Sequence, residues 1–307
     1  TDGIQVCLNP FTPPRGQYKK NEQIEKAWDI MASGFTALAG YDAEDIQSGQ
    51  PVKKFLLNLL QYSGHFDHLP SDFESLADLI LNPELLLDFG AEESVIAKLQ
   101  DTKKGLKKND REKLARIFSS YNSGVTRIIF MDGVPLDIET LITPIEKGKV
   151  PVNIFYLNSL DAEENRQTFM LGLSRKINSW MLKQGTETDE VKLLFFIDEI
   201  QKYLPPDNKA KPPPKDMLKL LFEQGRKYGV GCILATQSVS NVDYKSLGQC
   251  NTIFFGKLQK KQDISKIEDL LKSSEGHDSK LVDDLPKISE GEFQVSLSKK
   301  VSLEPIP

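Results

Sequence analysis

The chain has 307 residues, of which 39% are hydrophobic and 27% are charged, with a formal net charge of −5. This length suits one large or two ordinary domains, and the apolar fraction is sufficient for a packed core. The acidic balance argues against a protein that coats nucleic acid, because nonspecific DNA affinity comes mainly from neutralising phosphates.

The cysteines and the hydrophobic runs indicate where in the cell the protein is expected to occur. The three cysteines, Cys7, Cys232 and Cys250, are scattered, and two of them fall in or beside predicted strands. They are interpreted as reduced core residues rather than a disulfide framework. No hydrophobic run approaches the ~20 residues needed to cross a bilayer, and no signal pattern opens the chain. We therefore expect a cytoplasmic protein with no membrane partner.

The first 124 residues are predicted to form one strand followed by helices. Residues 4–8 alternate like a short strand, and prolines then interrupt the chain. We expect residues 1–20 to be a strand and linker of the protein's core, and residues 21–124 to be an inserted all-helical subdomain. Apolar residues recur at helical spacing at Ile24, Ala27, Trp28, Ile30, Met31 and Phe35, then Val52, Phe55, Leu56, Leu59 and Leu60, then Phe73, Leu76, Leu79 and Ile80, and less regularly at Val95, Ile96, Leu99 and Leu106.

A basic cluster lies within this helical region. It comprises Lys103, Lys104, Lys107, Lys108, Arg111, Lys113 and Arg116. It could face DNA, but no aromatic residues interleave with it, and nearby acids partly cancel its charge. A solvated helix face is the favoured interpretation.

After residue 124, strands alternate with helices. Such alternation is typical of an α/β protein with a mostly parallel sheet that is covered on both faces. The expected strands are 127–131, 152–157, 193–197 and 230–236, and the expected helices are 162–182 and 216–228.

Two adjacent carboxylates, Asp198 and Glu199, close the apolar run 193–197. A run without alternation suits a strand that is buried on both faces, and ligands of parallel sheets bind beyond the carboxyl ends of the strands. An Asp there can hold Mg²⁺ through water, while the neighbouring Glu can orient and deprotonate a water that attacks a γ-phosphate. The alternative is that the two acids only open a turn.

A second polar residue closes the next strand. Gln237 follows the strand 230–236, so it should project into the same crevice as Asp198 and Glu199. Arg226, at the end of the intervening helix, could supply a fixed positive charge for phosphate oxygens. Arg226 could act within its own subunit, act across a ring interface as an arginine finger, or form only an exposed salt bridge.

Three motifs carry a family resemblance: FIDE at 196–199, LLFEQGRKYGVG at 220–231 and LATQ at 234–237. These motifs resemble those of the HerA/FtsK superfamily of P-loop ATPases, specifically its bacterial and archaeal HerA-like branch. The resemblance extends through 249–258. It is good over 150–297 and thin before that.

This resemblance implies a RecA-like fold in which residues 125–307 form the carboxyl-terminal part of the ATPase core and contain the Walker B strand. The implied cofactors are ATP and Mg²⁺. The implied roles are Asp198 on Mg²⁺ through water, Glu199 as general base, and Arg226 and Gln237 as reporters of the γ-phosphate. The implied partners are double-stranded DNA, further copies of the chain in a hexameric ring, and a nuclease. The implied activity is translocation or helicase-like movement along DNA.

One departure from the family is large. The Gly-rich phosphate loop, Gly-x-x-x-x-Gly-Lys-Ser/Thr, occurs nowhere in the sequence, and the chain begins at Thr1 rather than Met. Without that loop most nucleotide affinity is lost. We therefore expect the carboxyl-terminal part of a longer ATPase, inactive as an isolated fragment. The alternative is a non-catalytic assembly or regulatory module with a degenerate ATPase fold.

The connection 204–215 is rich in proline and lysine, so it is expected to be an exposed loop rather than helix or interior strand. It leaves the acidic strand on the ligand side of the sheet. It could gate the nucleotide, touch a neighbouring subunit, or be a plain solvated loop.

Overall fold

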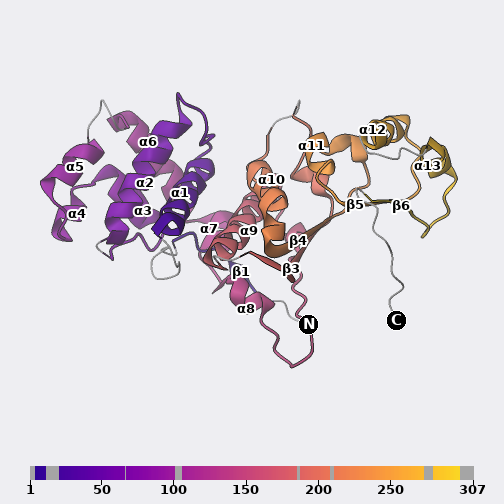
Figure 1. Ribbon diagram of the computed structural model, residues 1–307. Coiled ribbons are helices and arrows are strands. Elements are labelled where there is room, and N and C mark those ends of the chain that lie inside the picture. The colour runs from indigo at the N-terminus through magenta and orange to yellow at the C-terminus, as the bar shows by residue number, and fades with distance from the viewer. Residues whose placement is uncertain are drawn as a thin grey trace. The chain divides into compact units, whose positions relative to one another are not determined.

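The computed structural model of the protein describes residues 4–11, 21–65, 67–100, 106–184, 187–207, 211–272 and 279–297. Contacts between residues divide the chain into two compact units, Thr1–Glu187 and Thr188–Pro307, which we call unit 1 and unit 2 (Figure 1). Each unit is described by itself.

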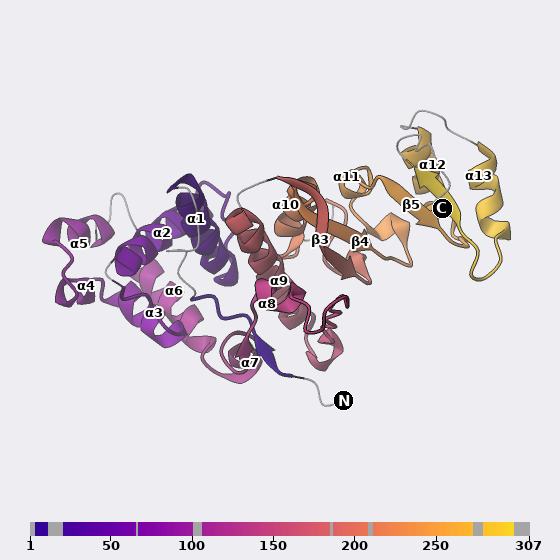
Figure 2. The same ribbon diagram turned by 60° about the horizontal axis from the view of Figure 1, so that its bottom comes forward.

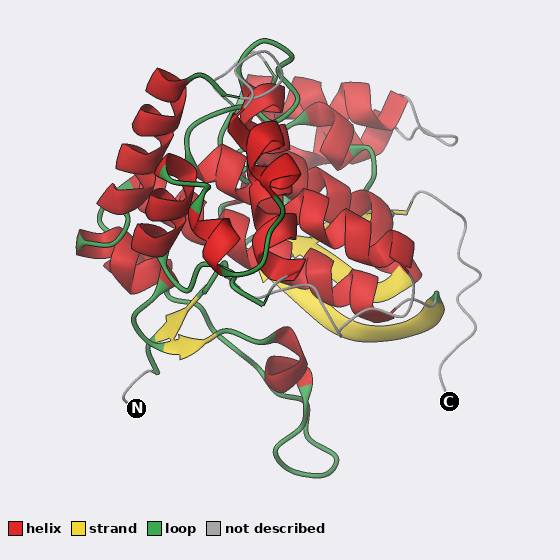
Figure 3. Ribbon diagram, turned by 90° about the vertical axis from the view of Figure 1, so that its left-hand side faces the viewer, coloured by secondary structure: helices red, strands yellow, loops and turns green. Residues whose placement is uncertain are grey.

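Helices make up nearly all of the regular structure of unit 1 (red in Figure 3), because its two strands have only two residues each. The helices of unit 1 are α1 (Asn21–Leu38), α2 (Gly49–His65), α3 (Phe73–Leu81), α4 (Leu85–Asp88), α5 (Glu93–Gln100), α6 (Lys108–Ser120), α7 (Gly124–Phe130), α8 (Ile138–Ile142) and α9 (Glu163–Gln184).

The apolar stripes of the first helices face a common core, as expected. All the predicted stripe residues of α2 and α3 are buried. Aromatic rings join the helices: the ring centroids of Phe35, Phe73 and Phe118 lie 5.8–6.3 Å apart. Such contacts add to the stabilisation that burial gives. The hydroxyl of Tyr121 donates a hydrogen bond of 2.5 Å to the carbonyl of Leu38, which ties the end of α6 to the end of α1.

The predicted strand 127–131 is wrong, because these residues belong mainly to α7. Ile129 and Phe130 are buried, and the ring of Phe130 lies 5.4 Å from that of Phe73. The β-branched and aromatic residues here have strand propensity, but packing against the aromatic core outweighs a preference worth at most about 1 kcal/mol.

The predicted strand 152–157 is also wrong. It has no ladder partner among the described residues, and it ends in a short 3₁₀ turn, Leu157–Ser159. Val152, Ile154 and Tyr156 are 82%, 86% and 72% exposed. The β-branched and aromatic residues here suit a strand, but a strand forms only where a neighbour supplies hydrogen bonds to the backbone.

The strand predicted at 4–8 is present but shorter. β1 (Val6–Cys7) pairs in parallel with β2 (Val134–Pro135), with Val6 opposite Val134. Pro135 has no backbone N–H, which limits the ladder on that side. The backbone N–H of Leu8 then donates to Ile129 at 2.8 Å, which attaches this segment to α7.

The long helix expected at 162–182 is confirmed as α9. Its predicted apolar face, Phe169, Leu173, Ile177 and Trp180, is buried.

Unit 2 contains the predicted pattern of strand, helix and strand. β3 (Thr188–Ile197) is followed by α10 (Lys215–Gln224), a 3₁₀ turn (Gly225–Lys227) and β4 (Tyr228–Leu234). β3 and β4 pair in parallel and lie side by side in Figure 2. The register is irregular near the start of β3 and continuous from Leu193, opposite Val230, to Ile197, opposite Leu234.

Burial of β3 on both faces, which we expected from its sequence, is wrong. Phe195 and Ile197 are 9% and 2% exposed, whereas Leu194 and Phe196 are 63% and 60% exposed. The strand therefore alternates between a covered and an uncovered face, as strands do when a core lies on one side only. Its uninterrupted apolar sequence does not reveal this difference.

The end of unit 2 holds a second, antiparallel pair. β5 (Thr252–Phe255) pairs with β6 (Gln294–Leu297), with Phe255 opposite Gln294. β5 lies within 249–258, the segment to which the family resemblance extends, and belongs to a different sheet from β3 and β4. The remaining helices of the unit are α11 (Tyr244–Leu247), α12 (Lys261–Lys272) and α13 (Ser279–Asp284). Phe255, Ile267 and Leu285 share one buried cluster.

The described residues thus form a mixed α/β structure with short parallel strands. Their strands form separate two-stranded sheets, and no extended RecA-like sheet joins them. The predicted domain boundaries at residues 20 and 124 stay a prediction. The two compact units of the chain meet between Glu187 and Thr188. Helices continue beyond residue 124, as α7, α8 and α9.

The cysteines are unpaired, with Cys7 buried and Cys232 and Cys250 half-buried. None of the helices in the part of the chain that the structure describes has both the length and the apolar character to cross a membrane.

Candidate functional site

The carboxyl ends of β3 and β4 meet at one edge of their sheet. The backbone N–H of Ala235 donates to Ile197 at 2.9 Å, and that of Ile200 donates to Ala235 at 3.1 Å. Backbone hydrogen bonds therefore hold the two strand ends together beyond Ile197 and Leu234, although the N–H of Glu199 is not part of the ladder. Consequently Asp198 and Glu199, after β3, lie beside Thr236 and Gln237, after β4.

Glu199 turns the chain sharply at this edge. Its φ of 54° and ψ of 43° are left-handed, a conformation that costs a residue other than glycine roughly 1–2 kcal/mol. The backbone N–H of Glu199 donates to Oδ1 of Asp198 at 2.9 Å. Backbone strain of this kind is frequent where a side chain is aimed at a functional site.

The carboxylate of Glu199 is held by two amides. Nε2 of Gln237 donates to Oε1 at 2.7 Å, and Nε2 of Gln201 donates to Oε2. Since an ionised carboxylate only accepts hydrogen bonds, the NH₂ groups of both glutamines must face it. Each donor to a charged acceptor makes a stronger bond than a neutral pair does.

A third residue orients one of these amides. Oγ1 of Thr236 donates to Oε1 of Gln201 at 2.7 Å, which fixes which end of the Gln201 amide faces Glu199. Gln201 and Thr236 were not predicted from the sequence. The only signal for them was their position, two residues after Glu199 and one before Gln237.

Asp198 is exposed at this edge of the sheet. Its one hydrogen bond among the described residues comes from the neighbouring backbone N–H. No group of three or more His, Cys, Asp or Glu side chains in the described ranges could hold a metal by itself. One free carboxylate oxygen fits Mg²⁺, which usually keeps several waters and takes one or two carboxylates plus substrate phosphates.

Arg226 is not brought to this edge. It lies in the 3₁₀ turn that precedes β4, whereas Gln237 follows β4. Seven strand residues rising about 3.3 Å each separate the two ends by roughly 20 Å. The side chain of Arg226 is exposed. Within one copy of unit 2, Arg226 and Glu199 therefore lie at opposite ends of the same strand pair.

The connection 204–215 is not the simple exposed loop that we expected. Leu204 is fully buried, as is Lys215, whose side chain is only 3% exposed. Nζ of Lys215 donates to the carbonyl of Pro205 at 2.6 Å and pairs with Asp207 at 2.7 Å. These contacts close the connection onto the start of α10. Residues 208–210 lie outside the described residues.

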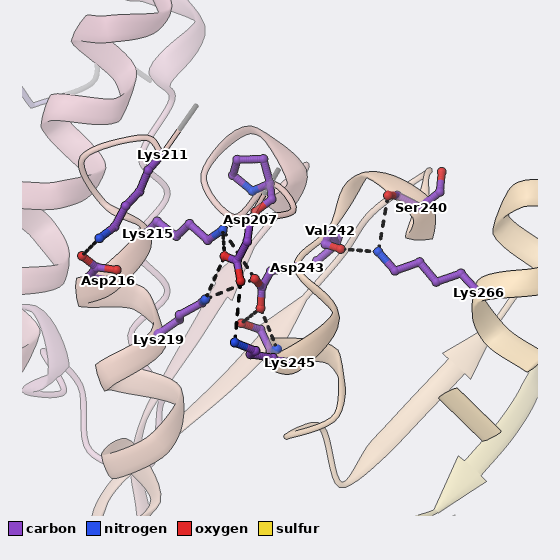
Figure 4. A network of polar contacts seen from close by, with 12 residues as sticks. Asp207, Lys211, Lys215, Asp216, Lys219, Ser240, Val242, Asp243, Lys245 and Lys266 are labelled. Carbon is purple, nitrogen blue, oxygen red and sulfur yellow. Dashed lines mark hydrogen bonds and ion pairs between the residues drawn. The ribbon is translucent and has the colours of Figure 1, made fainter. Parts of the chain in front are cut away.

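Asp243 joins this connection to the chain beyond β4 (Figure 4). It is 2% exposed, and its Oδ2 lies 3.4 Å from Nζ of Lys215 and 3.1 Å from Nζ of Lys219. Oδ1 accepts the backbone N–H of Ser246 at 3.0 Å and so caps α11. Burial raises the pKa of Asp243, but the hydrogen bonds from Ser246 and Lys219 outweigh it and hold the pKa well below its usual range.

The basic cluster of the helical region is only partly described, because Lys103 and Lys104 lie outside the described residues. Lys107, Lys108 and Arg116 are exposed on or next to α6. Nζ of Lys113 lies 5.6 Å from the ring centroid of Tyr41. Both interpretations of this cluster, DNA-facing and solvated, stay open.

No protein-family model matches the chain, and no curated protein matches it. Among solved structures, it is similar to the genome packaging NTPase B204 from Sulfolobus turreted icosahedral virus 2 in complex with ATP-gammaS, with 16% identity and a TM-score of 0.32. The match covers 41% of this chain and 55% of that one, so the chain spans about half the length of the packaging NTPase. A likeness this weak carries no functional assignment.

Proposed function

We propose that the chain is the carboxyl-terminal part of a HerA/FtsK-like ATPase that couples ATP hydrolysis to movement along double-stranded DNA. The observation that carries this proposal is the hydrogen bond of 2.7 Å between Gln237 and Glu199, from the ends of two neighbouring parallel strands. A carboxylate and an amide that meet at this edge suit a nucleotide whose γ-phosphate lies beyond the strands.

In this proposal Asp198 binds Mg²⁺ through water at the outer face of the edge. Its exposure and its single backbone contact support this role, because one carboxylate oxygen stays free. When bound, Mg²⁺ with ATP supplies the phosphoryl group and neutralises its developing charge.

Glu199 is the general base that takes a proton from the attacking water. The left-handed turn and the two amides fix the orientation of its carboxylate, and such positioning is the main contribution that a protein makes to phosphoryl transfer. Gln237 holds Glu199 in the absence of nucleotide and reports on the γ-phosphate when nucleotide is present.

Arg226 acts on a neighbouring subunit rather than on its own. The separation of roughly 20 Å along β4 argues against a contact between Arg226 and the γ-phosphate beside Glu199 of the same copy. An exposed arginine at the opposite end of the strands is free to cross an interface. We therefore favour a ring, which the family resemblance implies to be hexameric and to work with a nuclease partner.

The test is the ATPase rate of the full-length protein with Glu199→Gln. Loss of a general base should lower kcat by ~10²–10⁴ while leaving nucleotide binding nearly intact. Glu190→Gln, an exposed residue on the same strand, is the matched control and should keep the parent rate. A rate for Glu199→Gln equal to that of the control would remove Glu199 from the mechanism.

A second candidate is a non-catalytic assembly or regulatory module. The specific observation in its favour is that no Gly-x-x-x-x-Gly-Lys-Ser/Thr loop occurs in these 307 residues. The two candidates differ in nucleotide binding by the full-length protein. Calorimetric titration with Mg²⁺ and a non-hydrolysable ATP analogue should show saturable binding for an ATPase and none for a module.

A further inference from the structure

Unit 1 contains a cavity of about 460 Å³ that the proposed function does not use. It is bounded by α1, α7, α8 and α9 and by the segments that include β1 and β2. This volume falls within the range of about 300–1,000 Å³ that is usual for sites of small molecules. Every lining residue belongs to unit 1, so the cavity is complete within it.

Much of the cavity wall is apolar. Ile30 and Met31 from α1 face it, with Leu171 and Trp180 from α9. Nε1 of Trp180 donates to Oε2 of Glu139 at 2.7 Å, so the indole has its polar group satisfied and offers its ring to the cavity. These side chains can cover an aliphatic or aromatic body of a ligand.

One wall of the cavity carries an incompletely satisfied arginine. The guanidinium of Arg175 donates a long hydrogen bond from Nη2 to the carbonyl of Ser33, at 3.3 Å. Its Nε is shielded from solvent and has no hydrogen-bond partner among the described residues. Burial lowers the pKa of Arg175 to about 9.

The helix opposite is shaped to admit this guanidinium. A Cβ at Gly34 of α1 would lie 2.8 Å from Nη1 of Arg175, closer than real contacts allow. A glycine at this position therefore lets the charged plane lie against the backbone of α1. Among the described residues, no acid pairs with this half-buried guanidinium.

A second cation, Lys176, lines the same cavity. Its Nζ donates to the carbonyl of Asn9 at 3.5 Å, and burial lowers the pKa of Lys176 to about 8, although the carboxylate of Asp137 favours its charged form. Asp137 also accepts the backbone N–H and hydroxyl of Thr140, and Glu139 accepts the indole N–H of Trp180. A charge that is shielded from water normally has a counter-ion, and for Arg175 a ligand can supply it.

We propose that this cavity binds a small organic anion, whose carboxylate or phosphate monoester head contacts Arg175 and Lys176 and whose apolar body packs on Ile30, Met31 and Leu171. Arg175 can donate two parallel hydrogen bonds to either head group. This site is separate from the edge that carries Asp198 and Glu199, since those residues belong to unit 2.

Calorimetric titration of the full chain with four probes tests this. The probes are 1-naphthoate, 1-naphthyl phosphate, neutral 1-naphthalenemethanol and inorganic phosphate. Both aromatic anions should bind, while the alcohol and inorganic phosphate should each bind at least tenfold more weakly, because each lacks one of the two recognised parts. Comparing the two aromatic anions identifies the preferred head group. Equal binding of the neutral alcohol would overturn the proposal.

Arg175→Gln should weaken binding of the preferred anion by roughly tenfold or more, since a hydrogen bond to a charged group contributes about 1.5–3 kcal/mol. The matched control is Arg166→Gln on the same helix, outside the cavity, which should leave the affinity unchanged. Should Arg175→Gln fail to fold, Ser179→Met, which fills the lining from α9, should abolish binding. Unchanged affinity in either folded cavity variant would contradict the proposed site.

Discussion

Gln237, which follows β4, donates a hydrogen bond of 2.7 Å to Glu199, which follows β3. The two residues are 38 positions apart in sequence and meet because the strands before them are parallel and in register. This contact joins the two polar groups that the sequence places at separate strand ends.

Replacement of Gln237 by Ala should lower the ATPase rate of the full-length protein by roughly 10–100-fold. A hydrogen bond to a charged group contributes about 1.5–3 kcal/mol, and its loss frees the Glu199 carboxylate to turn away from the attacking water. Gln249→Ala is the control, because Gln249 contacts only the exposed Glu223, at 3.2 Å, among the described residues. Steady-state kinetics should show a fall in kcat for Gln237→Ala alone.

The left-handed backbone of Glu199 is expected to lower the stability of the folded protein. Glu199→Gly removes a conformational penalty of roughly 1–2 kcal/mol and adds glycine's own entropic cost of about 0.5–1 kcal/mol. The variant should therefore unfold at a higher urea concentration than Glu199→Ala, which loses the same hydrogen bonds from Gln201 and Gln237 but keeps the left-handed penalty. At Glu190, which lies within β3 where the backbone is extended, the Gly variant should instead be less stable than the Ala variant. Equal urea midpoints for the Gly and Ala variants at position 199 would contradict the strain argument.

Substitution of the buried Lys215 is expected to lower the stability of the folded protein strongly. Lys215→Met leaves the buried Asp243 with Lys219 as its remaining close cation. Removing one partner of a buried ion pair typically lowers the free energy of unfolding by about 3–5 kcal/mol. Because Asp207, the other partner of Lys215, is exposed, we expect a loss at the lower end of this range. Lys287→Met breaks a pair whose lysine is 71% exposed and should cost at most about 0.5 kcal/mol. Urea midpoints of the two variants measure the difference.

Asp243 also predicts how stability depends on pH. Its pKa in the folded protein lies below the unfolded value of about 3.9, so the unfolded chain binds more protons as the pH falls. The stabilisation from Asp243 is therefore fully present above about pH 5 and lost progressively as the pH falls from the unfolded pKa towards the lower folded pKa. Asp243→Asn should flatten the fall in urea midpoint between about pH 5 and 3.

The control for this effect is Asp284→Asn, whose partner Lys287 is exposed. It should keep the slope of the parent protein. The same slope in Asp243→Asn would mean that other carboxylates, among them Asp137 with its lowered pKa, dominate the acid range.

Much of the candidate site was predictable from the sequence. An apolar run that ends in two acids, a helix, and a second run that ends in a glutamine place Asp198, Glu199 and Gln237 at one edge, and the structure has them there. Gln201 and Thr236 were missed, because hydrogen bonds between side chains of separate strand ends leave no periodic signal.

The errors have a common physical origin. Residues 127–131 and 152–157 have the composition of strands, yet the first lies in α7 and the second pairs with no described strand. A helix is stabilised by hydrogen bonds within its own segment, whereas a strand needs a neighbour that the segment does not encode. This explains why α1, α2, α3 and α9 were predicted better than the strands.

By itself the sequence determined the helical stripes, the ends of β3 and β4 and the residue types at those ends, because all of these follow from local periodicity and chain order. Only the tertiary structure decided that one face of β3 is uncovered, that Arg226 lies far from Glu199, and that Arg175 is half-buried with no acid paired to it among the described residues. Burial and distance depend on which segments pack together, and that choice is made by the whole chain rather than by any stretch of it.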